Sequence, residues 1–265
     1  MLATFDHRTQ DSGNVSWIIR TEDGDLFVKT AGLPGPSPAG VPVPYLDHPD
    51  RVRLLRNAAD LARSSDHPCL APLRHVIETP VGPMLVYDRR PGELIGTDRL
   101  RRSDPTSAYQ RLANLSADDL LSVLDQLLSL HEALAEQDWV ACDLYDSSMI
   151  IDFATLQLTV VDLDSYHRGP SINTMGRMFG SDRYMAPEEY ELGATLDQRT
   201  TAYTLARIAW HFGTRLTEQP DQFFGPAGLR DTLQVALQAE RSRRFASVAD
   251  FTAAWAQDRW SAPSA

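Results

Sequence analysis

The sequence of 265 residues is poor in cysteine and has no long hydrophobic run. Two cysteines, Cys69 and Cys142, are too few for a disulfide framework and lack the spacing of a metal site. No apolar stretch approaches the ~18 residues that a membrane-spanning helix needs, and the N-terminal residues show no basic segment followed by an apolar one. We therefore expect a cytoplasmic protein that has no secretory signal and no membrane partner.

Basic residues are fewer than acidic residues. The chain has 36 aspartate and glutamate residues against 25 lysine and arginine residues, which gives a net charge of -11 and a pI near 5.0. This acidic balance argues against nucleic acid as a partner, because binding to phosphate backbones needs basic surfaces. The length is sufficient for a large hydrophobic core.

Lysine is nearly absent. Lys29 is the one lysine among the 25 basic residues, and arginine fills the other positions, as is typical of a GC-rich genome. A position that keeps lysine in this background favours a role that needs a compact ammonium group, such as binding phosphate. Chance retention is the alternative. Lys29 ends a predicted strand, 26–29, which follows an alternating strand from Val15 and a turn at Glu22–Asp25.

The sequence contains a predicted β-hairpin with an aspartate before its first strand and another after its second. Two short runs, Met149–Ile151 and Leu158–Val161, are rich in β-branched residues and predict paired strands. Asp143 precedes the first run, and Asp162 follows the second. Antiparallel pairing brings these ends to one edge, so we expect the two carboxylates to converge. A carboxylate beside a buried strand is costly unless it binds a cation, which indicates a base and a metal ligand on this edge.

Three motifs in the same order resemble the protein kinase superfamily. Residues 141–148 and 162–164 resemble its catalytic and metal-binding loops, and GSDRYMAPE at 180–188 resembles the end of its activation segment. The nearest resemblance is to bacterial Ser/Thr protein kinase-like domains of actinobacterial type. It implies an α+β, two-lobed fold, with a small β-rich N-lobe over residues 1–88 that binds nucleotide and a mostly helical C-lobe over 89–265 that carries both loops.

The resemblance also implies ATP and Mg²⁺ as cofactors. Asp143 would be the catalytic base, Asp162 the Mg²⁺ ligand, Lys29 the phosphate-binding cation, and Ser181 the hydroxyl that meets the base. The other implied positions are Gly13 and Val15 in a reduced glycine-rich loop, Val86, Tyr87 and Asp88 at the adenine-binding hinge, and Ser148 and Asp164 as further metal ligands.

One departure concerns the partner of Lys29. Counting back from Pro68, the glutamate that normally pairs with this lysine should stand at Ala58. Asp60 lies about 200° round the helix from the expected direction. We therefore expect no acidic side chain of the helix near 50–64 to hold Lys29.

Other departures lie around the base. Cys142 replaces the arginine before it, and Tyr145 replaces the lysine beside the γ-phosphate. Ser148 stands where the second metal-binding asparagine is expected, and Thr201 replaces an aspartate at the start of a later helix. Asp146 is an additional carboxylate that could compensate as a Mg²⁺ ligand.

Two further expectations concern structural residues. Glu188, at the end of the GSDRYMAPE motif, is expected to pair with Arg244. His131 is expected to be a packed or surface residue. Helices are also expected at 48–64, from Ser116 to about Glu136, and near 226–240 and 247–257, with strands at 73–77 and 83–87 and a proline-rich loop at 31–46.

Three functions fit these motifs. The 180–188 stretch favours a kinase that phosphorylates serine or threonine of a protein, because this element shapes a peptide groove in the family. The unusual DLYDSS loop and the short activation segment favour a small-molecule kinase that acts on an antibiotic or nucleoside. Ala58 and Ser148 favour a nucleotide-binding pseudokinase, whereas the joint presence of Lys29, Asp143 and Asp162 argues against it.

Overall fold

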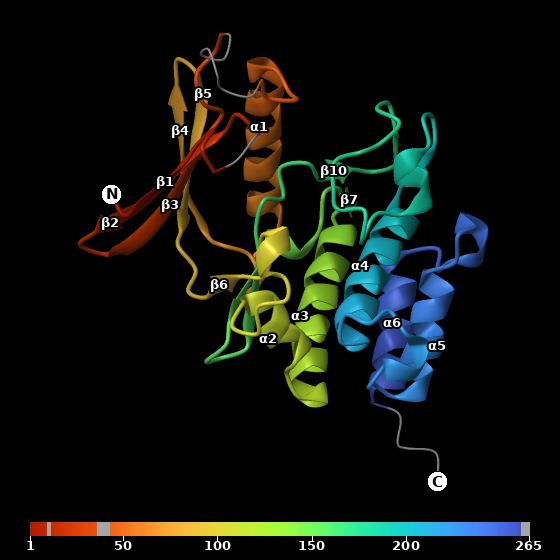
Figure 1. Cartoon of the computed structure of the whole chain (residues 1–265). Helices are drawn as coiled ribbons and strands as arrows, with labels where there is room; N and C mark the ends of the chain where they lie inside the picture. Colours follow the sequence, from red (N-terminus) through yellow and green to blue (C-terminus); the bar gives the residue numbers. More distant parts are fainter. Residues whose placement is uncertain (10–11, 36–42, 261–265) are drawn as a thin grey trace. The chain divides into compact units, whose positions relative to one another are not determined.

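The computed structural model describes residues 1–9, 12–35 and 43–260 and has an α+β fold (Figure 1). The chain divides into two compact units, Met1–Arg90 and Pro91–Ala265. The first unit contains a five-stranded sheet and one long helix, and the second contains most of the helices. In the part of the chain that the structure describes, no helix is long and apolar enough to cross a membrane.

The first unit is built on an antiparallel sheet with the strand order β1-β2-β3-β5-β4. Its two hairpins, β2-β3 and β4-β5, each pair strands that are consecutive in sequence, and β5 lies next to β3, which leaves β4 at the edge. The strands are β1 (Ala3–Phe5), β2 (Val15–Thr21), β3 (Gly24–Thr30), β4 (Leu73–Thr79) and β5 (Gly82–Asp88).

Helix α1 (His48–Ser64) packs on β4 and β5. It begins where the Asp47 carboxylate accepts a hydrogen bond from the Asp50 N–H at 2.9 Å, with proline in the first turn. Its buried face meets the sheet in a small cluster that includes Ala31, Leu55, Ala58, Ala59 and Leu85. Ala58 is therefore a packing residue, and its small side chain lets the helix lie close to the sheet.

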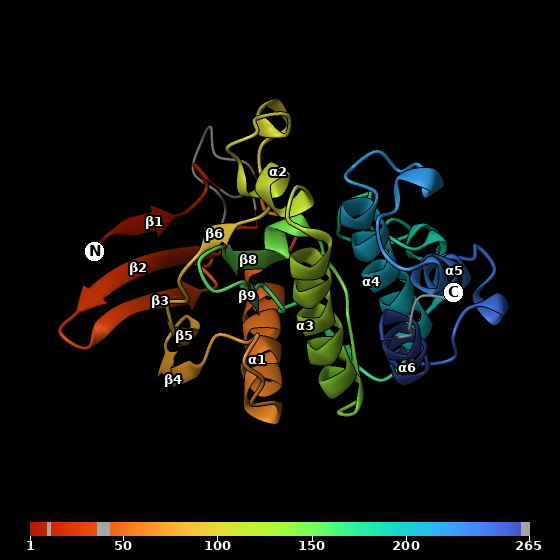
Figure 2. The same cartoon turned by 90° about the horizontal axis from the view of Figure 1, so that it is seen from below.

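The helices of the second unit pack around α4, which is buried along most of its length. In Figure 2, α3 and α4 lie side by side, and α4 contacts α5 and α6. Helix α3 begins at the predicted residue, because the Ser116 hydroxyl accepts from the Asp119 N–H at 3.1 Å. The helices are α2 (Ala108–Ala113), α3 (Ala117–Ala135), α4 (Gln198–Gly213), α5 (Ala227–Ala236) and α6 (Val248–Arg259).

Short strands complete the second unit and position its loops. The predicted hairpin is present as β8 and β9, and α3 packs on β9. A further strand, β6, extends this hairpin to three strands, and two-residue ladders join β7 to β10 and β11 to β12. These strands are β6 (Glu93–Leu94), β7 (Trp139–Val140), β8 (Met149–Asp152), β9 (Gln157–Val160), β10 (His167–Arg168), β11 (Ser171–Ile172) and β12 (Thr195–Leu196).

The predicted long elements are confirmed, and the structure differs from the prediction at one turn and one short strand. The turn between β2 and β3 consists of Glu22 and Asp23 alone, since Gly24 already pairs with Thr21. Strand β1 was not predicted, because three residues are too few to show a period. The predicted loop at 31–46 lies partly outside the described residues.

The packing of α1 yields a stability prediction. Lys29 lies directly opposite Leu85 on the sheet, so both side chains share the face that carries the Ala58 cluster. Ala59→Glu should destabilise the protein by more than ~3 kcal/mol, because it buries a charge. Ala58→Glu should cost about half of that or less, because its carboxylate can approach Lys29. Urea unfolding of both variants measures the difference, and equal losses would place Lys29 out of reach of position 58.

Candidate functional site

The β8–β9 hairpin gathers three of the predicted site residues at one edge. The Val161 N–H donates to the Ser148 carbonyl oxygen at 2.8 Å, which continues the strand pairing to the residue before Asp162. The Ser148 hydroxyl donates to the Asp143 carbonyl oxygen at 3.2 Å. Ser148 is buried, and it connects the loop that carries Asp143 to the strand end that carries Asp162.

Both aspartates have left-handed backbones, with φ of 61° at Asp143 and 62° at Asp162. Side chains other than glycine rarely adopt this conformation, which costs on the order of 1–3 kcal/mol at each residue. Such strain persists only where surrounding contacts fix the chain, and it concentrates at functional sites. Its presence at both aspartates shows that the surrounding contacts hold the chain in this conformation on either side of the hairpin.

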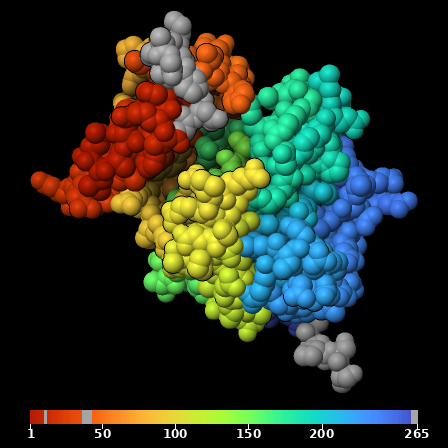
Figure 3. Space-filling view, viewed as in Figure 1, coloured from red at the N-terminus to blue at the C-terminus, as the bar shows by residue number. Residues whose placement is uncertain are grey.

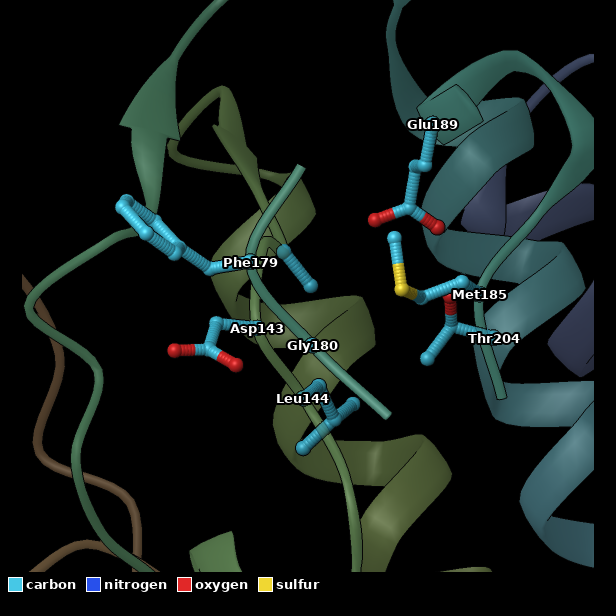
Figure 4. Close-up of a pocket in the computed structure, with 8 residues that line it drawn as sticks. Asp143, Leu144, Phe179, Gly180, Met185, Glu189 and Thr204 are labelled. Atoms are coloured by element: carbon cyan, nitrogen blue, oxygen red, sulfur yellow. The ribbon is translucent and has the colours of Figure 1, made fainter. Parts of the chain in front are cut away.

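A small pocket lies beside Asp143, with an empty volume of about 200 Å³. Figure 4 shows the Asp143 carboxylate turned to the opposite side of its loop from Glu189, Met185 and Thr204. Gly180 has φ of 135°, a conformation that strains any residue with a side chain, so glycine is favoured here. The lining residues are Ala141, Asp143, Leu144, Phe179, Gly180, Met185, Glu189 and Thr204.

The strongest anchor of the 180–188 segment is the predicted ion pair between Glu188 and Arg244, which is confirmed. The guanidinium donates to both carboxylate oxygens, at 2.8 and 3.0 Å, and both residues are buried. The Thr200 hydroxyl donates to the same carboxylate at 2.8 Å. Two-pronged contacts of this kind fix orientation as well as adding energy.

Helix α4 also holds the chain just before Asp143. The Ala141 N–H donates to the Thr201 hydroxyl oxygen at 2.9 Å, and both residues are buried. Thr201, which departs from the kinase pattern, thus still binds the backbone of this loop. His131 is packed, as expected, with Nδ1 bonded to the Leu127 carbonyl oxygen and Nε2 to the Tyr166 hydroxyl, both at 2.8 Å.

Asp146 differs from its predicted role as a spare metal ligand. Its carboxylate is 5% exposed and accepts from the Arg183 guanidinium at 2.8 Å and from the Tyr184 hydroxyl at 3.4 Å. Because Arg183 already neutralises this charge, Asp146 joins the 141–148 loop to the 180–188 segment and is unsuited to binding Mg²⁺ there.

The predicted metal ligands do not form a preformed cage. Within the described ranges, no group of three or more His, Cys, Asp or Glu side chains is arranged to hold a metal ion. Asp162 is exposed, whereas Asp164 and Ser148 are buried. Mg²⁺ is commonly held by one or two carboxylates together with phosphates and waters, and Asp162 with its neighbours provides oxygen donors of that type.

In the first unit, Lys29 is 9% exposed and lies between Ser16 and Leu85 in the sheet. Val15 pairs with Thr30 at the start of β2. Gly13 has φ of 78°, and a Cβ atom there would lie 2.5 Å from Pro44 and 3.0 Å from Arg51. Close packing explains why this position needs glycine.

The predicted hinge residues end strand β5. Val86 is buried opposite Val28, and Tyr87 lies opposite Phe27. The Asp88 carboxylate accepts from Arg74 at 2.7 Å. Ser181, in the second unit, is half-buried, and its carbonyl oxygen accepts from the Tyr184 N–H at 2.9 Å.

Sequence reasoning missed Glu189, a pocket residue that is only 3% exposed. Its carboxylate accepts from the Ala186 N–H at 2.6 Å. Burial raises the pKa of Glu189 to about 7, and the negative charges of Glu188 and Asp143 add to this effect. The sequence signal was the pair of adjacent glutamates after Pro187. Neighbouring residues on a helical turn point in different directions, so both cannot face solvent on the same side.

The protein thus has an α+β fold, and two aspartates with left-handed backbones flank one of its hairpins. No family model matches the chain. Among curated proteins, it is similar to serine/threonine-protein kinase 1 of African swine fever virus, with 25% identity over 101 residues. The match covers 38% of this chain and 34% of the viral protein, so the chain spans about a third of its relative. This likeness hints at a kinase-like relationship.

The buried Glu189 predicts a pH dependence of stability. An unfolded chain protonates this carboxyl near pH 4.5, whereas the folded protein does so near pH 7. The folded state therefore binds the additional proton between these values, and the free energy of unfolding falls as the pH rises through this window. Glu189→Gln should remove this fall and stabilise the protein at pH 8 by on the order of 1–3 kcal/mol. Chemical unfolding at pH 5 and 8 tests this, and parallel changes in wild type and variant would contradict it.

Proposed function

We propose that the protein is an ATP-dependent phosphotransferase that transfers the γ-phosphate to a hydroxyl group, with serine or threonine of a protein as the acceptor. The observation that carries this proposal is the placement of Asp143 and Asp162 at one edge of the hairpin, each with a left-handed backbone. Two fixed carboxylates suit a reaction that needs one proton acceptor and one metal ligand. The likeness to a viral protein kinase supports the same class.

Each residue has a role in this proposal. Asp143 accepts the proton of the attacking hydroxyl, and Ser181 helps to orient Asp143. Lys29 binds the phosphates as a compact cation. Asp162 holds Mg²⁺, with Ser148 and Asp164 as further oxygen donors, and the bound ion supplies charge neutralisation at the phosphates.

A protein acceptor is favoured over a small molecule by the way the 180–188 segment is held. Glu188 binds Arg244, and Asp146 binds Arg183, so ion pairs hold the segment at its end and near its middle. A fixed backbone beside the base suits an extended peptide. The net charge of -11 favours a basic acceptor.

A nucleotide-binding pseudokinase is the second candidate. It is supported by Ala58, which lies in the hydrophobic cluster under the sheet at the position where the kinase pattern has a glutamate. The acidic residue next along α1, Asp60, is 69% exposed and pairs with Arg63 at 3.8 Å. The two candidates share nucleotide binding and differ in turnover.

The base is tested by Asp143→Asn, which keeps the shape of the side chain. Phosphate transfer from ATP to histone should fall by roughly 10²–10⁴-fold, because the hydroxyl proton loses its acceptor. ATP affinity, measured by calorimetry, should stay within about twofold, because the base does not hold the nucleotide. Asp152→Asn, at the opposite end of the same hairpin, is the matched control. If wild type and variant both bind ATP and neither transfers phosphate to histone or to a panel of small hydroxylated acceptors, the pseudokinase is correct.

The phosphate-binding role is tested by Lys29→Arg. The charge is kept, but the planar guanidinium cannot occupy the position of the ammonium group on this buried strand. We expect ATP-dependent turnover to fall at least ~10-fold at a temperature where circular dichroism shows the variant to be folded. Undiminished turnover would show that lysine has no special role here.

A further inference from the structure

A chain of buried polar side chains starts at the catalytic loop and runs to the surface of the second unit. It begins at Asp146, whose carboxylate accepts from the Arg183 guanidinium at 2.8 Å. The same Arg183 nitrogen donates to the Tyr109 hydroxyl at 3.4 Å. Tyr109 bonds to His211 Nε2, and His211 Nδ1 bonds to Glu218. All of these residues except Arg183 and Glu218 are buried.

The direction of each bond follows from the donors available. The Glu218 carboxylate only accepts, so His211 Nδ1 carries a proton, and in the neutral imidazole Nε2 accepts from the Tyr109 hydroxyl. The Tyr109 oxygen is then oriented to accept from Arg183, whose charge meets Asp146. Each member thereby fixes the orientation of the next.

Two further contacts close this chain into a ring. The Arg207 guanidinium donates to the Arg183 carbonyl oxygen at 2.9 Å and to Glu218 at 3.2 Å. The guanidinium of Arg183 also lies over the rings of Tyr109 and Tyr184, 5.8 and 5.5 Å from their centroids. Three kinds of contact therefore restrain Arg183: a hydrogen bond to its carbonyl oxygen, the ion pair of its guanidinium with Asp146, and the two tyrosine rings beneath the guanidinium.

The outer end of this hydrogen-bonded series, Glu218, lies in a loop with a strained backbone. Arg215, Leu216 and Glu218 have left-handed φ values of 50°, 65° and 62°. The Glu218 N–H donates to the Thr214 hydroxyl at 3.2 Å, which fixes the loop after α4. In Figure 3, the yellow surface near residues 100–110 borders the light-blue surface near 215–225, which is where this loop lies. Strain of this kind is retained where a side chain must be held in one position.

Stability alone does not account for this network. Burying an ion pair costs desolvation, and apolar residues of the same volume are often equally stable or more so. What a fully bonded polar network adds is a single orientation of its members. Here, the member that gains this orientation, Arg183, connects the loop that carries Asp143 to the segment that carries Ser181.

We propose that Arg183 is a positioning residue for the catalytic loop, and that Tyr109, His211 and Glu218 hold Arg183 in place. The inference rests on the proposed phosphotransferase function where activity is measured. The internal Arg183–Asp146 pair makes the arrangement of Asp143 and Ser181 a permanent feature of the fold, with no modification needed to order it.

The test compares Tyr109→Phe with Tyr166→Phe. Both changes remove one buried hydroxyl that bonds to a histidine Nε2, but only Tyr109 also contacts Arg183. We expect Tyr109→Phe to lower kcat for phosphate transfer from ATP to histone about tenfold or more, with KM for ATP changed less than about twofold. Tyr166→Phe should lower the melting temperature similarly but change kcat less than about threefold.

Hydrogen–deuterium exchange provides a readout that does not need activity. Tyr109→Phe should speed exchange of the backbone amides of 144–149, and Tyr166→Phe should leave that segment closer to wild type. Equal kcat and equal exchange in the two variants would overturn the proposal. A wild-type protein without phosphate transfer would contradict the proposed function, and the exchange comparison alone would then decide whether the network positions the loop.

A second test asks whether the hydrogen-bonded residues from Asp146 to Glu218 act cooperatively. Tyr109→Phe and Glu218→Ala each interrupt the chain of contacts, since the second change removes the acceptor for His211 Nδ1, so the double variant should exchange at 144–149 no faster than the more affected single variant. Effects that multiply would show that Glu218 acts independently of Tyr109, which would contradict the chain.

Discussion

The constraint on which the second unit depends is the left-handed backbone at Asp143 and Asp162. An isolated chain would seldom hold both residues in it, because the left-handed conformation is unfavourable for most side chains, even though aspartate adopts it more readily than most. The hairpin between them supplies part of the restraint, since β8 and β9 pair up to Val161, and Ser148 binds the carbonyl oxygen of Asp143. The remaining restraint has to come from elements that are distant in sequence.

Those elements act mainly through buried polar contacts. Thr201 of α4 binds the backbone just before Asp143, and Arg183 binds Asp146 just after it. The Glu188–Arg244 pair then fixes the segment that contains Arg183 to the C-terminal part of the unit. Contacts of this kind contribute little net energy, but they admit few alternative arrangements. The unit is therefore organised to hold a loop in one conformation.

Periodicity and turn chemistry predicted the main elements, because each has a clear local signal: alternation in β2, the capping serine of α3, and β-branched residues in β8 and β9. The hairpin that separates Asp143 from Asp162 was predicted, whereas the approach of their two carboxylates stays a prediction. Local patterns could not predict the His211–Glu218 contact, because it requires a strained loop after α4. Nor could they show that Asp146 is neutralised by an arginine 37 positions away.

The central claim is that this edge serves a nucleotide and its metal ion. Calorimetric titration of the wild-type protein with ATP, in the presence and absence of Mg²⁺, tests it most directly. If Asp162 holds the ion, ATP should bind at least ~10-fold more tightly with Mg²⁺, and Asp162→Asn should abolish the difference, while Asp164→Asn has a smaller effect. Equal affinity with and without Mg²⁺, or an unchanged Mg²⁺ effect in Asp162→Asn, would contradict the assignment of this edge.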